Sequence, residues 1–112
     1  MLRDERDYIL HMIAAAAAAV ARLREKLIGG SAPAEIVQAA RAAQGELLGK
    51  DAALLRALDS ATAARMLGAV RLPAWADLLQ VEADGWRLAG KLDEALGAEA
   101  RADALRALAK KP

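Results

Sequence analysis

The first 28 residues carry the pattern that most constrains the fold, an apolar repeat with helical spacing. Apolar side chains recur there at alternating steps of four and three, which is the spacing of a heptad seam on one face of an α-helix: Ile9, Ile13, Ala16, Val20, Leu23 and Leu27. Residues 14–19 are all alanine, so this helix is slim around its whole circumference. The pattern predicts a long helix that lies closely against another helix, in the same chain or in a second copy.

The rest of the chain shows helix signals and no strand signals. No stretch alternates apolar and polar residues with β-branched side chains, and Thr62 is the only threonine. Caps and breakers predict helices at about 4–28, 32–48, 52–58, 60–70, 73–89 and 91–109. The residues that set these limits are Gly29–Gly30, Ser31 with Pro33, Gly49, Asp51, Asp59 or Ser60, Leu72–Pro73 and Gly90.

The domain organisation follows from the length and from these short connections. A chain of 112 residues is expected to form one domain. Short connections predict that successive helices are antiparallel neighbours. We therefore expect a single all-α domain over 1–112, with a long helix at 1–28, short helices at 32–71 and a helix pair at 73–109.

Composition argues against several classes of function. The net charge is +1 and both signs are interspersed, so the basic surface of a nucleic-acid binder is missing. Without cysteine there is no disulfide, thiolate zinc site or cysteine nucleophile. One histidine, two serines and one threonine, without a phosphate-binding loop, predict a protein that is not an enzyme. We expect no cofactor and no metal, since Asp4, Asp7 and His11 alone are a poor ligand set.

The apolar stretch at residues 9–23 raises the question of a membrane. It is shorter than the roughly 20 residues that a spanning helix needs and consists mainly of alanine. A secretory signal is the closer alternative, but Asp4, Glu5 and Asp7 stand where a basic leader belongs. We expect no membrane partner and a cytoplasmic protein. The excess of arginine over lysine suggests a bacterial genome rich in G and C.

Self-association is suggested by the poverty of large apolar side chains. Alanine is the commonest residue, and aromatic residues make up only 3% of the chain. A buried alanine methyl contributes only about 0.8 kcal/mol, so such a core gains little from burial. Pairing with a second copy adds buried surface.

One stripe of residues in the expected helix at 73–89 is a candidate site. Steps of four, three and four place its members on one face: Trp75, Leu79, Glu82 and Trp86. A second stripe lies about 100° away, formed by Leu78, Val81, Gly85 and Leu88. The two stripes are typical of a helix buried on two sides, or they form a groove for a peptide or small apolar ligand. Glu82 needs a partner or water in such a stripe.

The expected pair at 73–109 resembles one tetratricopeptide (TPR) repeat. The resemblance is carried by Leu79, Ala83, Trp86, the segment 90–95 and Ala102. Small residues let two antiparallel helices approach closely, and one large residue fills their crossing. Glu82, Glu99 and the lack of a closing proline depart from the TPR pattern. The resemblance implies a TPR-like array of antiparallel helices.

The start of the chain is similar to an uncharacterised bacterial family of short, TPR-like helical proteins. The segment Asp7-Tyr8-Ile9-Leu10, followed by Met12-Ile13, carries this similarity, although His11 replaces the arginine expected there. The middle of the chain, with Gly49, Leu54-Leu55 and Leu67-Gly68, is also similar. The family has no assigned activity, so the similarity implies a fold and no function.

The sequence therefore predicts a helical protein-interaction or scaffold protein that also pairs with itself as a homodimer. The residues expected to bind a partner on the first helix are Ile9, Met12, Ile13, Ala16, Val20, Leu23 and Leu27. In the alternative arrangement, this helix folds back and its seam is part of the core. A binding module for a peptide or small apolar ligand beside Trp75 and Trp86 is the second hypothesis, and an enzyme is the third.

Overall fold

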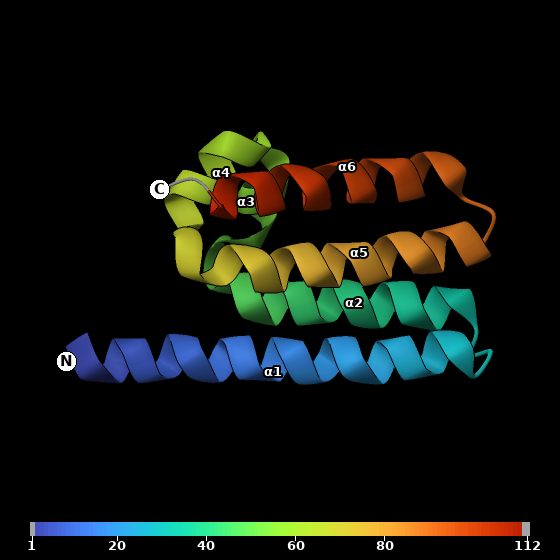
Figure 1. Ribbon diagram of the computed structural model, residues 1–112, viewed down its shortest axis with the longest axis horizontal. Helices are drawn as coiled ribbons and strands as arrows, with labels where there is room; N and C mark the ends of the chain where they lie inside the picture. Colours follow the sequence, from blue (N-terminus) through green and yellow to red (C-terminus); the bar gives the residue numbers. More distant parts are fainter. Residues whose placement is uncertain (1, 111–112) are drawn as a thin grey trace.

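The computed structural model describes residues 2–110, and within them every regular element is helical. The all-α prediction is confirmed. The helices are α1 (Leu2–Ile28), α2 (Pro33–Leu48), α3 (Ala52–Ala57), α4 (Ser60–Leu67), α5 (Leu72–Leu88) and α6 (Leu92–Ala109), with short 3₁₀ helices η1 (Gly49–Asp51) and η2 (Ala69–Arg71). Figure 1 shows α1, α2, α5 and α6 stacked in that order, with α3 and α4 gathered at one end.

Two glycine turns reverse the chain at one end of the stack (Figure 1). Gly30 has a φ of 81°, and the N–H of Ser31 donates to the carbonyl of Lys26 at 3.0 Å. Gly90 has a φ of 76°, and the N–H of Lys91 donates to the carbonyl of Trp86 at 2.9 Å. A positive φ of this kind is easy only for glycine, so these residues set where α1 and α5 end.

The helix expected at 60–70 is shorter in the structure, and the next one begins earlier. Gly68 has a φ of 92°, which ends α4 at Leu67 and leads into η2. Leu72 is itself helical, with φ −60° and ψ −45°, although a residue before proline usually avoids that region. Pro73 falls in the first turn of α5, where its missing N–H leaves no hydrogen bond unmade.

One of the expected N-caps is formed and another is not. Asp59 caps α4: its carboxylate accepts from the backbone N–H of Thr62 at 3.0 Å and from the Thr62 hydroxyl at 2.6 Å. These two hydrogen bonds hold the pKa of the Asp59 carboxyl below its ordinary value. Asp51 makes no capping hydrogen bond, because η1 leads directly into α3 and the N–H of Ala52 bonds to the carbonyl of Gly49.

The core is organised around α5, which packs against α1, α2 and α6. It contributes nine buried residues, consistent with a helix covered on two sides. All six α-helices contribute residues to the core or pack against it. The largest fully buried apolar side chains are Trp75, Ile36, Leu47, Leu78, Leu105 and Val81.

Gly85 allows α2 and α5 to approach closely, which gives a first prediction. A Cβ at this position would lie 2.9 Å from Cγ2 of Val37 and 3.2 Å from Cγ2 of Ile36. Gly85→Ala should therefore lower the free energy of unfolding by about 1–3 kcal/mol, because both neighbours are stiff β-branched side chains. Urea denaturation followed by circular dichroism measures this loss.

Gly97 provides the matched control for this prediction. It also lies inside a helix, but nothing lies within 4 Å of an added Cβ. Gly97→Ala should raise the free energy of unfolding by roughly 0.5–1 kcal/mol through helix propensity alone. If both substitutions stabilise the protein equally, the close approach at Gly85 is not a constraint.

Candidate functional site

The centre of the predicted seam on α1 lies inside the chain's own core. Ala16, Val20 and Leu23 are buried among residues of the other helices. Three more seam residues, Ile9, Ile13 and Leu27, are only half-buried. Met12, which the sequence also predicts to bind a partner, is half-buried as well. Because the buried centre is covered within the chain, a partner can reach α1 only on the adjoining faces.

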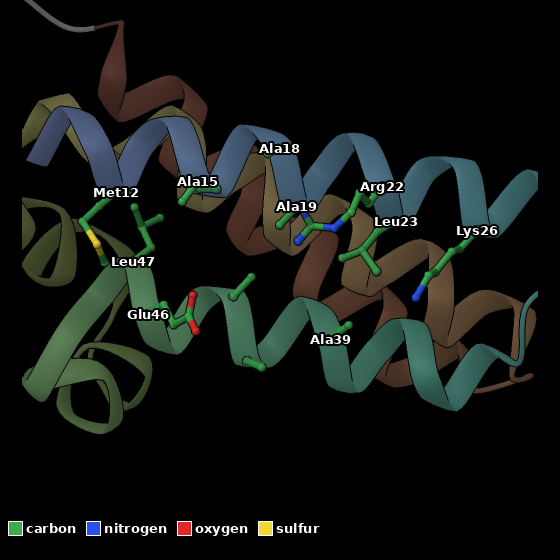
Figure 2. Close-up of a pocket in the computed structure, with 13 residues that line it drawn as sticks. Met12, Ala15, Ala18, Ala19, Arg22, Leu23, Lys26, Ala39, Glu46 and Leu47 are labelled. Atoms are coloured by element: carbon green, nitrogen blue, oxygen red, sulfur yellow. The ribbon is translucent and has the colours of Figure 1, made fainter.

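A groove runs along one of these faces, between α1 and α2 (Figure 2). It has a volume of about 400 Å³, and alanines from both helices make up much of its lining, among them Ala15, Ala18, Ala39 and Ala42. Their methyl groups are too small to close the space between the two helices. The groove is therefore a consequence of the alanine-rich composition of α1 and α2.

Charged side chains stand along the walls of the groove. Arg22 and Lys26 extend from α1, and Glu46 lies on α2 (Figure 2). All three are exposed. The end of the groove nearest the C-terminus of α1 is therefore lined by two positive charges, while Met12 and Leu47 lie at its other end.

Beyond the groove, the first turns of α1 expose apolar and acidic side chains together. Tyr8 is 56% exposed and Leu10 is 49% exposed. Tyr8 and Ile9 line a shallow hollow with Asp4 and Glu5. The core therefore leaves most of this part of α1 uncovered.

The tryptophan stripe is closed by the fold. Trp75 is fully buried at 0% exposure, and Leu79 and Glu82 are also buried. Trp86, nearer the end of α5, is half-buried. These residues therefore do not line an open groove beside the two tryptophans.

Glu82 has hydrogen-bond donors on both of its carboxylate oxygens. Nε2 of Gln44 donates to Oε1 at 2.8 Å, and Nε1 of Trp86 donates to Oε2 at 2.9 Å. The Arg41 guanidinium lies 3.4 Å from Oε2 and brings a positive charge to the rim of the site. The Glu82 carboxylate thus joins α2 to α5 through a satisfied polar network.

The network continues from Gln44 to Trp75. Nε1 of Trp75 donates to Oε1 of Gln44 at 3.3 Å, and Gln44 is only 1% exposed. The Arg101 guanidinium lies 5.5 Å from the centre of the Trp75 ring and donates to the carbonyls of Leu55 and Leu58. These contacts tie α6 to α3 across the tryptophan.

Two arginines around this network have perturbed pKa values. Burial lowers the pKa of Arg101. Burial and then the positive charge of Arg41 lower the pKa of Arg56, while Glu82 opposes that change. Arg56 donates to the backbone carbonyl of Arg41 at 2.7 Å. Both guanidinium groups stay charged, so they act as fixed positive charges around the core.

From the sequence we expected Glu82 to need a partner, but we did not identify Gln44 as that partner. A signal for Gln44 was present, because it falls on the buried face of α2 at helical spacing from Ala40 and Leu47. A polar residue inside such an apolar stripe must be hydrogen-bonded. Its position alone, however, does not say which helix supplies the partner.

The described part of the chain contains neither a cluster of metal ligands nor a helix that could span a membrane. No group of three or more histidine, cysteine, aspartate or glutamate side chains gathers there in a way that could hold a metal ion. His11 is exposed on α1. Within residues 2–110, no helix is both long and apolar enough to cross a bilayer.

No family model, curated protein or solved structure matches this chain. Two exposed features of α1 are available for binding, the groove that it forms with α2 and its uncovered first turns.

Proposed function

We propose that this chain is a non-catalytic, helical protein-interaction protein that associates with itself through α1. The groove between α1 and α2 is the observation that carries the proposal. It is open, has a volume of about 400 Å³, and combines small apolar side chains with charged walls. Grooves of this kind accept an amphipathic helix, because alanine lets two backbones approach closely.

The proposal includes a TPR-like arrangement of α5 and α6 as the rigid support for α1. Ala83, Ala95 and Ala102 are fully buried, as small residues at a close helix crossing would be. Arg87 and Glu99 join the two helices on the surface, with nitrogen and oxygen 2.9 Å apart. A rigid support favours binding because less conformational freedom is lost when a partner docks.

The small size of the side chains that a single chain buries also supports self-association. Among the described residues, nine of the buried apolar side chains are alanines, and Trp75 is the only aromatic one. Because a buried alanine stabilises far less than a leucine, a second copy that covers the groove adds stability that the single chain lacks.

Sedimentation velocity over a range of concentrations tests the proposal. We expect a concentration-dependent dimer with a dissociation constant in the micromolar range, about −8 kcal/mol of binding free energy. Ala18→Glu, which places a charge in the groove, should give a monomer at tens of micromolar. Ala17→Glu is the matched control, because Ala17 is exposed on α1 but does not line the groove.

Two outcomes would contradict the proposal. A wild-type chain that stays monomeric throughout this range does not self-associate. Equal dimerisation of the Ala17→Glu and Ala18→Glu variants would show that association uses a surface other than the groove. Circular dichroism of each variant establishes that the helices are intact.

A further inference from the structure

α1 is longer than the helix beside it, and the difference leaves a free end. α1 has 27 residues and α2 has 16, which correspond to lengths of about 40 Å and 24 Å. Met12 and Leu47 lie together at the end of the groove (Figure 2). Residues 4–11 of α1 therefore extend past the end of α2. We call this segment the overhang.

The overhang and the groove lie along the same side of α1. At about 100° per residue, Tyr8, Ala15, Arg22 and Lys26 fall within an arc of about 40°. Tyr8 lines the hollow on the overhang, and the other three line the groove. A helix laid along this side would therefore contact both segments.

The charges along α1 are complementary end to end. The overhang carries three acidic residues against one arginine, Arg6, and residues 22–26 carry three basic residues against one acidic residue, Glu25. The overhang is therefore net negative and the far end of the groove, with Arg22 and Lys26, is net positive. A second α1 in the same direction would place like charges together, and Tyr8 would face Tyr8. A second α1 in the opposite direction places acidic residues beside basic ones at both ends.

Resting on the proposed function, we infer that the partner is a second copy whose overhang lies antiparallel in the α1/α2 groove. The two-fold axis passes beside Ala15, so each overhang enters the other chain's groove. Tyr8 lies seven residues before the axis in its own chain, and the partner's Arg22 lies seven residues after the axis in the other chain. Because the two helices run in opposite directions, these two side chains lie at the same level. This register brings the Tyr8 ring under the partner's Arg22 guanidinium, a cation–π contact.

The same register places acidic residues of each overhang at the basic end of the partner's groove. Asp7 lies beside the partner's Arg22, and Glu5 lies beside the partner's Lys26. At the axis, Ala15 faces the partner's Ala15, where methyl groups permit close packing of the helices. The interface is isologous and closes on itself, so it forms a dimer and not a chain of subunits.

Disulfide trapping tests the register, because the natural sequence has no cysteine to give background. Ala15→Cys should form a disulfide-linked dimer under mild oxidation, since residues at the axis come within the Cα separation of about 4.4–6.8 Å that a disulfide needs. Ala17→Cys, which is exposed but does not line the groove, is the matched control. It should cross-link at least tenfold more slowly.

The orientation is tested by two further cysteine variants. Tyr8→Cys mixed with Arg22→Cys should give the heterodisulfide, while each variant alone should cross-link at least tenfold less. The result that would overturn the inference is efficient self-cross-linking of Tyr8→Cys, which only a parallel arrangement explains. A dimer that Ala18→Glu disrupts but that Ala15→Cys does not trap also overturns this register and leaves the proposed function standing. A monomeric wild-type chain overturns both.

The charge pairing has its own matched test. Arg22→Glu should raise the dissociation constant of the dimer about tenfold, because it places two repulsive contacts in the symmetric interface. Arg24→Glu makes the same change on the opposite face of α1 and should leave the constant unchanged. Equal effects of the two variants would contradict the pairing.

Discussion

Replacing Trp75 with alanine is expected to lower the free energy of unfolding by about 3–5 kcal/mol. Trp75 is the largest fully buried side chain and lies on α5, at the centre of the core. Its removal leaves a cavity that the surrounding helices cannot fully close. A small domain has a free energy of unfolding of about 5–15 kcal/mol, so this substitution removes a large part of it.

Two polar contacts are lost together with the ring. Oε1 of Gln44 loses its indole donor, and the Arg101 guanidinium loses the aromatic face 5.5 Å away. Urea denaturation followed by circular dichroism measures the total effect. Leu88→Ala is the control, because Leu88 lies on the same helix but is exposed, and a change within about 0.5 kcal/mol is expected. A loss below about 1 kcal/mol for Trp75→Ala would mean that the tryptophan is not a central packing element.

The second large effect is expected at the buried carboxylate. Glu82→Leu should lower the free energy of unfolding by about 2–4 kcal/mol, because Nε2 of Gln44 and Nε1 of Trp86 lose their acceptor. Glu82→Gln should lower it less, since the amide oxygen still accepts one hydrogen bond. Both values come from the same urea titrations.

A surface ion pair and a double-mutant cycle are the controls for this effect. The Arg87–Glu99 pair has a comparable nitrogen–oxygen distance of 2.9 Å but is exposed, so Glu99→Ala should cost about 1 kcal/mol or less. Combining Gln44→Leu with Glu82→Leu should cost less than the sum of the two single changes, with a coupling of about 0.5–3 kcal/mol. If the free-energy losses of the two single changes simply add in the double variant, the Gln44 and Glu82 side chains do not stabilise the protein through their mutual contact.

Local signals in the sequence were sufficient for most helix limits. Gly30 and Gly90 adopt positive φ and end their helices, and the Asp59 carboxylate caps α4. These features depend on a few adjacent residues, so they can be recognised without the fold. The limits that differed, at Gly68 and Leu72, lie where the 3₁₀ helix η2 separates α4 from α5 and leads directly into α5.

The candidate sites were less predictable, because periodicity shows which residues share a face and not what covers that face. The sequence pattern of the α1 seam allowed two interpretations, a stripe that binds a partner or a part of the chain's own core. Tertiary packing placed Ala16, Val20 and Leu23 inside the chain. The groove lies beside this seam and contains alanines of both helices, so α1 alone did not reveal it.

Local patterns of amino acids are enough to predict an all-α chain, its helix-ending glycines and the need of Glu82 for a partner. The packing of the helices was needed to show that Gln44 and Trp86 supply hydrogen bonds to that carboxylate. Packing also leaves most of the overhang of α1 uncovered while it buries the centre of the seam. The reason is physical: helix formation and termination depend on neighbours along the chain, whereas burial and hydrogen-bond partners depend on helices that are distant in sequence.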